Sequence, residues 1–160
     1  MKTMLLPALA ALALAACATT ETSGPQSMPA NETRIAFDIT DGNATALIAK
    51  LNVIDLTRRQ LLEKGVTPRF VLAFRGDASY YTQTNLAAIK ETDRADALKI
   101  ASMLREFRKA NGVEAVEQCN VPLAARKLKP GDVMQEVKLV PNGWISLAEY
   151  QRKGYAYIAP

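Results

Sequence analysis

Residues 113–123, VEAVEQCNVPL, join a short β-like run to a predicted helix start, and Cys119 lies at this junction. The chain contains no histidine. Its absence excludes Ser-His and Cys-His catalysis and histidine-based metal binding. One thiol without histidines is a weak ligand set, so we expect no metal and no cofactor. The covalent chemistry that remains is thiol chemistry at Cys119.

The segments on both sides of this junction alternate between strand and helix patterns. Short apolar runs are separated by stretches in which leucine and isoleucine recur at helical spacing, and glycines follow the helical stretches. Such alternation predicts an α/β domain with a mostly parallel sheet between helical layers. The predicted strands are 33–40, 68–74, 113–118, 136–140 and 155–158, and the predicted helices are 47–62, 98–107, 123–128 and a last one ending at Lys153.

Polar residues follow the ends of the predicted strands. In open α/β sheets, ligands bind beyond the carboxyl ends of the strands. We therefore expect one edge of the domain to gather these residues into a site. They are Asp41, Arg75, Gly76, Cys119, Asn120 and Asn142.

The sequence around Cys119 favours a stabilised thiolate. Asn120 is a candidate cap and Pro122 suits a first helical turn, so a helix is expected directly after the sulfur. The partial positive charge of a helix start, with Arg75 as a nearby cation, would stabilise a thiolate or persulfide. For the last helix, Asn142 or Ser146 is the expected cap, and Ser146 with Glu149 fits a capping box.

The N-terminal segment predicts export and lipidation. Residues 1–16 carry one charge, Lys2, followed by an uncharged leucine-rich run that is shorter than the roughly 20 residues of a spanning helix. Residues 14–17, LAAC, resemble a bacterial lipobox, in which Cys17 is lipidated and becomes the mature N-terminus. The alternative is an ordinary signal peptide with an incidental cysteine. Ala18 resembles the pattern of lipoproteins sent to the outer membrane, so we expect a periplasmic protein anchored there.

The sequence divides into a signal peptide at 1–16, lipidated Cys17 with a flexible tether to residue 32, and a folded domain at 33–160. The tether contains almost no bulky apolar residue, so it cannot offset the entropy of ordering. Lipidation of Cys17 would leave Cys119 as a lone thiol in an oxidising compartment. Removal of Lys2 with the signal peptide lowers the formal charge from +4 to +3, a mild surplus that predicts no nucleic-acid partner.

Four segments of the C-terminal half resemble the DsrE/DsrF-like family. They are 111–113 (NGV), 118–120 (QCN), 137–143 (VKLVPNG) and 150–160 (YQRKGYAYIAP). The resemblance extends over residues 34–160 and is weak between Asp77 and Asp93. It implies a three-layer α/β/α domain with a five-strand parallel sheet, usually assembled as a homo-oligomer.

The resemblance also implies a function in sulfur relay, because family members carry sulfane sulfur as a persulfide on a cysteine in this region. By position, that cysteine is Cys119. We therefore expect a membrane-tethered sulfur carrier or sulfurtransferase with a sulfur donor or acceptor protein as its partner. This chain has Val121 where the branch often has threonine, so a hydroxyl near the sulfur is missing. Membership supports the fold more firmly than an enzyme activity.

Two interpretations of the site stay open. Free cysteines are often buried apolar fillers, and Asp41 with Gly42 fits a simple turn. The second function is therefore a non-catalytic module that binds a protein partner or a small ligand at the same edge. An exposed Cys119 with a lowered pKa would favour the sulfur carrier. A buried or blocked thiol would favour the binding module.

Overall fold

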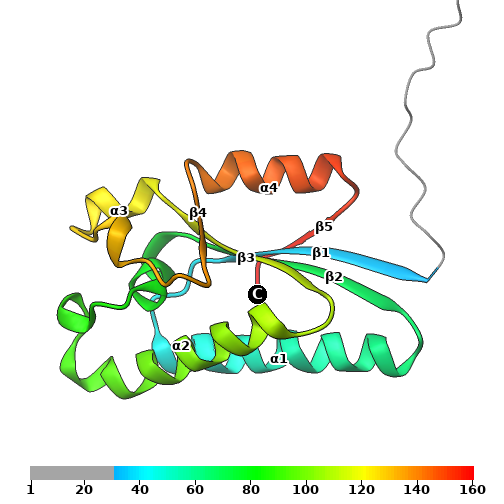
Figure 1. Cartoon of the computed structure of the whole chain (residues 1–160), viewed down its shortest axis with the longest axis horizontal. Helices are drawn as coiled ribbons and strands as arrows, with labels where there is room; N and C mark the ends of the chain where they lie inside the picture. Colours follow the sequence, from blue (N-terminus) through cyan, green and yellow to red (C-terminus); the bar gives the residue numbers. More distant parts are fainter. Residues whose placement is uncertain (1–30) are drawn as a thin grey trace, which may run out of the picture.

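The computed structural model describes residues 31–160, which form a five-stranded sheet with helices on both faces (Figure 1). All strand pairs are parallel, in the order β4-β3-β2-β1-β5. The predicted three-layer α/β/α class with a five-strand sheet is therefore confirmed. The strands are β1 Glu32–Ile39, β2 Thr67–Phe74, β3 Val113–Cys119, β4 Lys138–Val140 and β5 Ala156–Ile158.

Two long helices cover one face of the sheet and a shorter helix covers the other (Figure 1). α1 and α2 pack against each other on the first face, and α4 lies on the second. The short helix α3 follows the carboxyl end of β3. The helices are α1 Ala44–Glu63, α2 Arg94–Lys109, α3 Val121–Ala125 and α4 Gly143–Arg152.

The turn between β1 and α1 ends in a side-chain cap at Asn43. The Asn43 side chain accepts a hydrogen bond from the backbone N–H of Ala46 at 2.9 Å, and the Asn43 N–H donates to Asp41 Oδ1 at 2.8 Å. These bonds satisfy backbone donors that the first turn of a helix leaves free. The chain therefore passes from β1 into α1 within a few residues.

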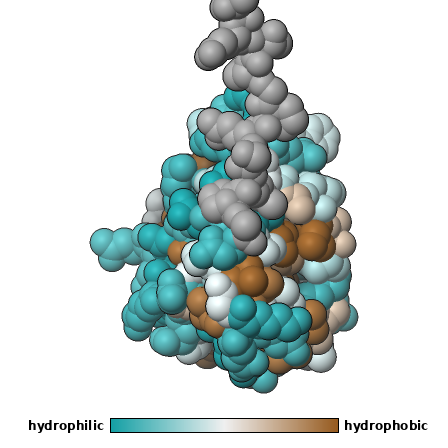
Figure 2. Space-filling model, turned by 90° about the vertical axis from the view of Figure 1, so that its right-hand side faces the viewer, coloured by the Kyte–Doolittle hydropathy of each residue, from teal (hydrophilic) through white to brown (hydrophobic). Residues whose placement is uncertain are grey.

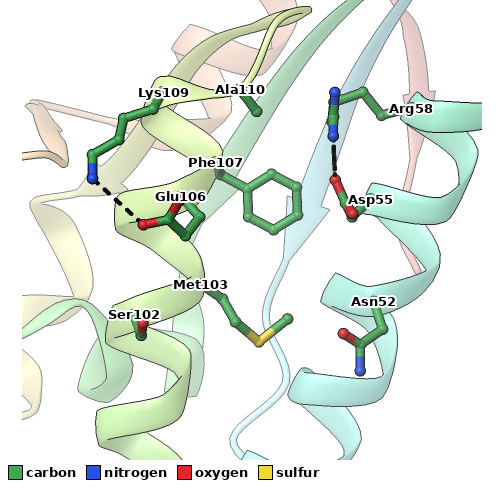
Figure 3. Close-up of a pocket in the computed structure, with 9 residues that line it drawn as sticks. All are labelled: Asn52, Asp55, Arg58, Ser102, Met103, Glu106, Phe107, Lys109 and Ala110. Atoms are coloured by element: carbon green, nitrogen blue, oxygen red, sulfur yellow. Dashed lines mark hydrogen bonds and ion pairs between the residues drawn. The ribbon is translucent and has the colours of Figure 1, made fainter. Parts of the chain in front are cut away.

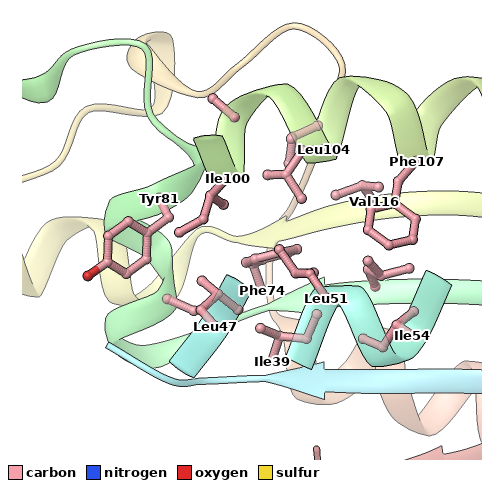
Figure 4. Packing of buried hydrophobic residues seen from close by; sticks show 14 of the residues in the cluster. Ile39, Leu47, Leu51, Ile54, Phe74, Tyr81, Ile100, Leu104, Phe107 and Val116 are labelled. Atoms are coloured by element: carbon pink, nitrogen blue, oxygen red, sulfur yellow. The ribbon is translucent and has the colours of Figure 1, made fainter. Parts of the chain in front are cut away.

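The large apolar core lies between the sheet and the α1/α2 layer (Figure 4). Figure 4 shows side chains of α1 and α2 meeting those of the strands, with the rings of Phe74 and Phe107 among them. The helical spacing of leucine and isoleucine in the sequence produces this face. Its fully buried members include Leu47, Leu51, Phe70, Leu72, Phe74, Ile100 and Leu104.

The apolar cluster beneath α4 is much smaller. It consists of Ala36, Val71, Ala73, Leu147 and Tyr155. Leu147 is the member that α4 contributes. The short α4 layer therefore rests on few apolar contacts, and polar contacts contribute more to its placement.

The structure differs from the prediction at several places. The stretch after β2, where the sequence predicts no helix or strand, folds as three short 3₁₀ helices, η1 Gly76–Thr82, η2 Leu86–Ala88 and η3 Glu91–Asp93. β4 begins at Lys138 rather than at residue 136. α3 begins before the expected residue 123, because Pro122 fits its first turn.

α3 also ends earlier than expected. Lys127 adopts the left-handed conformation with φ 55°, and the N–H groups of Lys127 and Leu128 bond back to the carbonyls of Ala124 and Leu123. This pattern closes a helix and prevents its continuation. α3 is therefore a helix of five residues.

No helix within residues 31–160 is both long and apolar enough to cross a membrane. The predicted signal peptide, Cys17 and most of the tether lie outside the described residues. Figure 2 views the end of the domain at which β1 begins. Hydrophilic side chains cover much of this end, and hydrophobic ones gather in smaller patches between them.

Candidate functional site

Cys119 is the last residue of β3 and the free cysteine of residues 31–160. It is buried, with 4% of its surface exposed. Its Sγ accepts a hydrogen bond from the backbone N–H of Gly143 at 3.1 Å. Gly143 is the first residue of α4, so the N-terminus of that helix points a donor at the sulfur.

This arrangement corrects the expected role of Asn120. Asn120 occupies the N-cap position of α3, but its side chain makes no capping bond. It is exposed, and its backbone N–H donates to the carbonyl of Val140 at 2.9 Å. The hydrogen bond on the sulfur thus comes from α4, which is distant in sequence, and not from the helix that follows Cys119.

Asn142 is the residue that caps α4. Its Oδ1 accepts a hydrogen bond from the N–H of Trp144 at 3.0 Å. The alternative cap, Ser146, lies inside α4, and its hydroxyl donates to Glu117 at 2.5 Å. The predicted capping box of Ser146 and Glu149 is therefore wrong, whereas the Asn142 cap is confirmed.

A pocket of about 290 Å³ lies beside Cys119 at the carboxyl edge of the sheet. Arg75, Gly76 and Asn142 line it with Cys119, so the structure brings four of the predicted site residues together. Asn120 and Asp41 are not among its lining residues. The other residues of the wall come from α3, the turn that follows it and α4; they are Val121, Pro122, Ala125, Arg126 and Trp144.

Arg75 is held from two sides. Its Nε donates to Asp38 Oδ1 at 2.7 Å and its Nη2 donates to Asp38 Oδ2, and its guanidinium lies 5.5 Å from the centre of the Trp144 ring. The hydrogen bonds to Asp38 raise the pKa of Arg75, so the cation is permanent. Tyr157 of β5 donates to Asp38 Oδ2 at 2.6 Å. Asp38 is itself 5% exposed, so its buried carboxylate requires these hydrogen-bond partners.

Gly143 is the point of closest approach between these groups. A Cβ at this position would lie 2.7 Å from Arg75 Cδ and 3.0 Å from Cys119 Cβ. Real Cβ atoms do not come so close to their neighbours without displacing them. Glycine is therefore required for α4 to start directly over the sulfur.

Asp41 belongs to the turn and not to the pocket. It forms an ion pair with Lys50, with Nζ 2.8 Å from Oδ2. The hydrogen bond from Lys50, followed by that from Asn43, lowers the pKa of the Asp41 carboxyl. The structure therefore gives Asp41 a role in the β1–α1 connection.

Sequence reasoning missed the two carboxylates on the α4 side of the sheet. Asp38 and Glu117 lie within strands that were interpreted as apolar runs, and both are buried. The available signal was an acidic residue beside apolar ones near the carboxyl end of each strand, Asp38 after Phe37 and Glu117 after Val116, because a buried charge requires a partner. Trp144 and Arg126 were missed as pocket residues, since the fold of α3 and α4 alone places them there.

A larger hollow of about 440 Å³ lies between α1 and α2 (Figure 3). Its charged side chains are paired with each other, Arg58 with Asp55 and Lys109 with Glu106. Phe107 and Met103 form its apolar part. The hollow has no thiol among its lining residues, and its serine, Ser102, is exposed, so the chemistry favours the smaller pocket at Cys119.

Metal ligands are not gathered anywhere in the part of the chain that the structure describes. No group of three or more cysteine, histidine, aspartate or glutamate side chains in residues 31–160 could hold an ion.

Residues 23–160 match the DsrE/DsrF-like family. The chain belongs to this family. The resemblance noted in the C-terminal segments is therefore confirmed, and the family match includes all of β1 to β5.

Two comparisons place this DsrE/DsrF-like protein among known ones. It is 30% identical over 129 residues to an uncharacterized protein of Aquifex aeolicus (strain VF5), covering 81% of this chain and 56% of that protein. The chain thus spans little more than half the length of the curated relative. A solved protein of unknown function from Methanobacterium thermoautotrophicum is similar with a TM-score of 0.57 and 18% identity, over 80% of this chain and 99% of that chain. That likeness supports the fold.

Proposed function

We propose that this DsrE/DsrF-like protein carries sulfane sulfur as a persulfide on Cys119. The observation that carries the proposal is the hydrogen bond from Gly143 N–H to Cys119 Sγ, beside a pocket open to solvent. A helix N-terminus stabilises a thiolate or a persulfide anion. Arg75 adds a positive charge on the same wall, although Asp38 offsets much of it.

The transfer step needs no external oxidant. The Cys119 thiolate attacks the terminal sulfur of a donor persulfide, a new S–S bond forms at Cys119, and the donor S–S bond breaks. The donor leaves as a thiolate and takes up a proton. The reverse exchange with an acceptor thiol would return Cys119 to its original state.

A second candidate function is a binding module without sulfur chemistry. The exposed fraction of Cys119, 4%, favours this candidate, since a buried thiol is a common apolar filler. The same pocket would then bind a small ligand or a side chain of a partner. Walls made by Val121, Pro122 and Ala125 suit an apolar group.

Peptide mass spectrometry distinguishes the two candidates. The full chain with Cys17→Ser is incubated with inorganic polysulfide, and its persulfides are then alkylated and located by peptide. We expect one added sulfur atom on the peptide that contains Cys119, and none in a folded Cys119→Ser chain. Absence of sulfur from Cys119 in the folded protein would favour the binding module.

We also propose that the protein is a periplasmic lipoprotein of the outer membrane. The support is the sequence of residues 14–17 with the uncharged run before it. Labelling of growing bacteria with a fatty acid should mark the wild-type chain and leave Cys17→Ser unmarked. A soluble, unlabelled wild-type protein would contradict the anchor.

We propose two kinds of protein partner, further copies of this chain and a sulfur donor or acceptor. The rim of the pocket supports the second, because Trp144 is 69% exposed and Val121 is 60% exposed. Exposed tryptophan beside arginine is typical of protein interfaces. Trp144→Ala should weaken transfer to a partner protein far more than it weakens loading by inorganic polysulfide. Sedimentation of the purified chain tests the homo-oligomer.

A further inference from the structure

Glu117 is a buried carboxylate that the sulfur-transfer step does not use. It lies on β3 two residues before Cys119 and is 1% exposed. Ser146 Oγ donates to its Oε2 at 2.5 Å, and Tyr150 OH donates to its Oε1 at 3.0 Å. Lys138 Nζ lies 3.2 Å from Oε1. A charge this deeply buried requires such partners, and two of the three belong to α4.

The same strand face also holds Cys119. Residues two apart on a strand point to the same side, so Glu117 and Cys119 both face α4. Gly143 and Ser146 are three residues apart on α4 and therefore lie on one face of the helix. The bond of Gly143 to Cys119 and the bond of Ser146 to Glu117 thus run in parallel between the same helix and the same strand.

Apolar contacts hold α4 at few points. Leu147 belongs to the buried cluster on this face and the Tyr150 ring packs against that cluster, whereas Trp144 is exposed. Small movements of the helix would carry the Gly143 N–H away from the sulfur, because a hydrogen bond weakens steeply with distance and angle.

We propose that Glu117 is a positioning residue for Cys119. By accepting hydrogen bonds from Ser146 and Tyr150, it fixes α4 so that the Gly143 N–H points at the Cys119 sulfur. The inference rests on the proposed function in taking Cys119 as the reacting group. It extends that function by assigning a task to a buried carboxylate on the strand and two hydroxyls on the helix.

The test must keep the carboxyl group of Glu117 together with its charged partner Lys138. Removal of this negative charge would itself make the Cys119 thiolate easier to form, and would mask a displaced helix. The other charged groups around the thiol are Arg75 with Asp38, Arg126 and Lys138, and they also stay unchanged. The substitutions are therefore made on the donors, as Ser146→Ala with Tyr150→Phe.

The experiment is the pH profile of Cys119 alkylation by iodoacetamide in the full chain with Cys17→Ser. The midpoint of the profile reports the thiol pKa, whereas a change in access alters the plateau. Loss of a charge-assisted hydrogen bond should move the midpoint about one pH unit higher and slow alkylation at neutral pH about tenfold at equal plateau. The matched control is Ser102→Ala with Tyr80→Phe, which removes the same two hydroxyls outside α4 and should leave the midpoint unchanged.

An unchanged midpoint in a folded Ser146→Ala/Tyr150→Phe protein would overturn the proposal. If that variant does not fold, Ser146→Ala alone gives the decisive profile, and Ser146→Thr, which keeps the hydroxyl, should restore the wild-type midpoint. Alkylation requires no sulfur donor. A shifted midpoint in a protein that never loads sulfur would therefore reject the sulfur carrier and retain the positioning role.

Discussion

The two faces of the sheet differ in what they bury. The face toward α1 and α2 buries a large apolar cluster that includes Phe70, Phe74 and Leu104. The face toward α4 buries five apolar residues and, beside them, Asp38, Glu117 and Cys119. The first face is stabilised by the hydrophobic effect, which does not depend on direction. The second face depends on hydrogen bonds and ion pairs, which do.

This difference assigns separate tasks to the two faces. A charge is costly inside deep apolar packing, whereas a reactive thiolate requires hydrogen-bond donors close to it. In this chain the apolar packing lies on one side of the strands, and the thiol with its donors lies on the other side. Substitutions on the α1/α2 face should therefore change stability, and substitutions on the α4 face should change the reactivity of Cys119.

The largest expected effect is a loss of stability from a substitution on the α1/α2 face. Phe70 is fully buried, and its ring packs edge-on against Phe37 at 5.1 Å between centres. Phe70→Ala should lower the free energy of unfolding by about 3–5 kcal/mol, since it removes apolar contacts and leaves a cavity. Urea denaturation measures the loss. The alkylation midpoint of Cys119 should not move, and a shift in the folded variant would contradict the separation of tasks.

A smaller effect is expected at the start of α4. Gly143→Ala should lower the free energy of unfolding by about 1–3 kcal/mol, because the new Cβ collides with Arg75 and Cys119. It should also slow alkylation of Cys119. Gly131→Ala is the matched control, since a Cβ there would meet nothing within 4 Å. If the two variants are equally stable in urea denaturation, the start of α4 is not in close contact with Arg75 and Cys119.

The smallest expected effect concerns alkaline pH. Burial, followed by the hydrogen bond to Glu114, raises the pKa of Tyr155 to about 12 from its ordinary 10.0. Because the folded-state pKa is raised, this residue stabilises the fold fully below pH 10, and its contribution is lost as the pH rises to about 12. Tyr155→Phe should flatten the fall in unfolding free energy across this window. A fall as steep as in the wild type would contradict the assignment.

Much of the fold follows from local sequence patterns. The apolar run of β2 and the helical spacing of α1 and α2 act within a few residues, so their periodicity predicts them. The shared carboxyl edge follows from the parallel sheet, and it correctly places Arg75 and Asn142 beside Cys119.

The failures at the site involve partners distant in sequence. Ser146 matches a capping box, yet its hydroxyl donates to Glu117, 29 residues away. The helix start capped by Asn120 is expected to stabilise the sulfur, whereas the N–H that bonds to it belongs to Gly143, 24 residues from Cys119. Local patterns contain no information on such pairs, because packing of α4 on β3 creates them.

The most direct test of the account is a complete cycle of sulfur loading and release followed by intact mass. The full chain with Cys17→Ser is loaded with polysulfide, separated from it, and mixed with a small thiol. The account predicts that the chain gains the mass of one sulfur atom and loses it to the thiol, and that the chain with both Cys17→Ser and Cys119→Ser does neither. A folded chain that gains no sulfur, or that gains it equally without Cys119, would contradict the central claim.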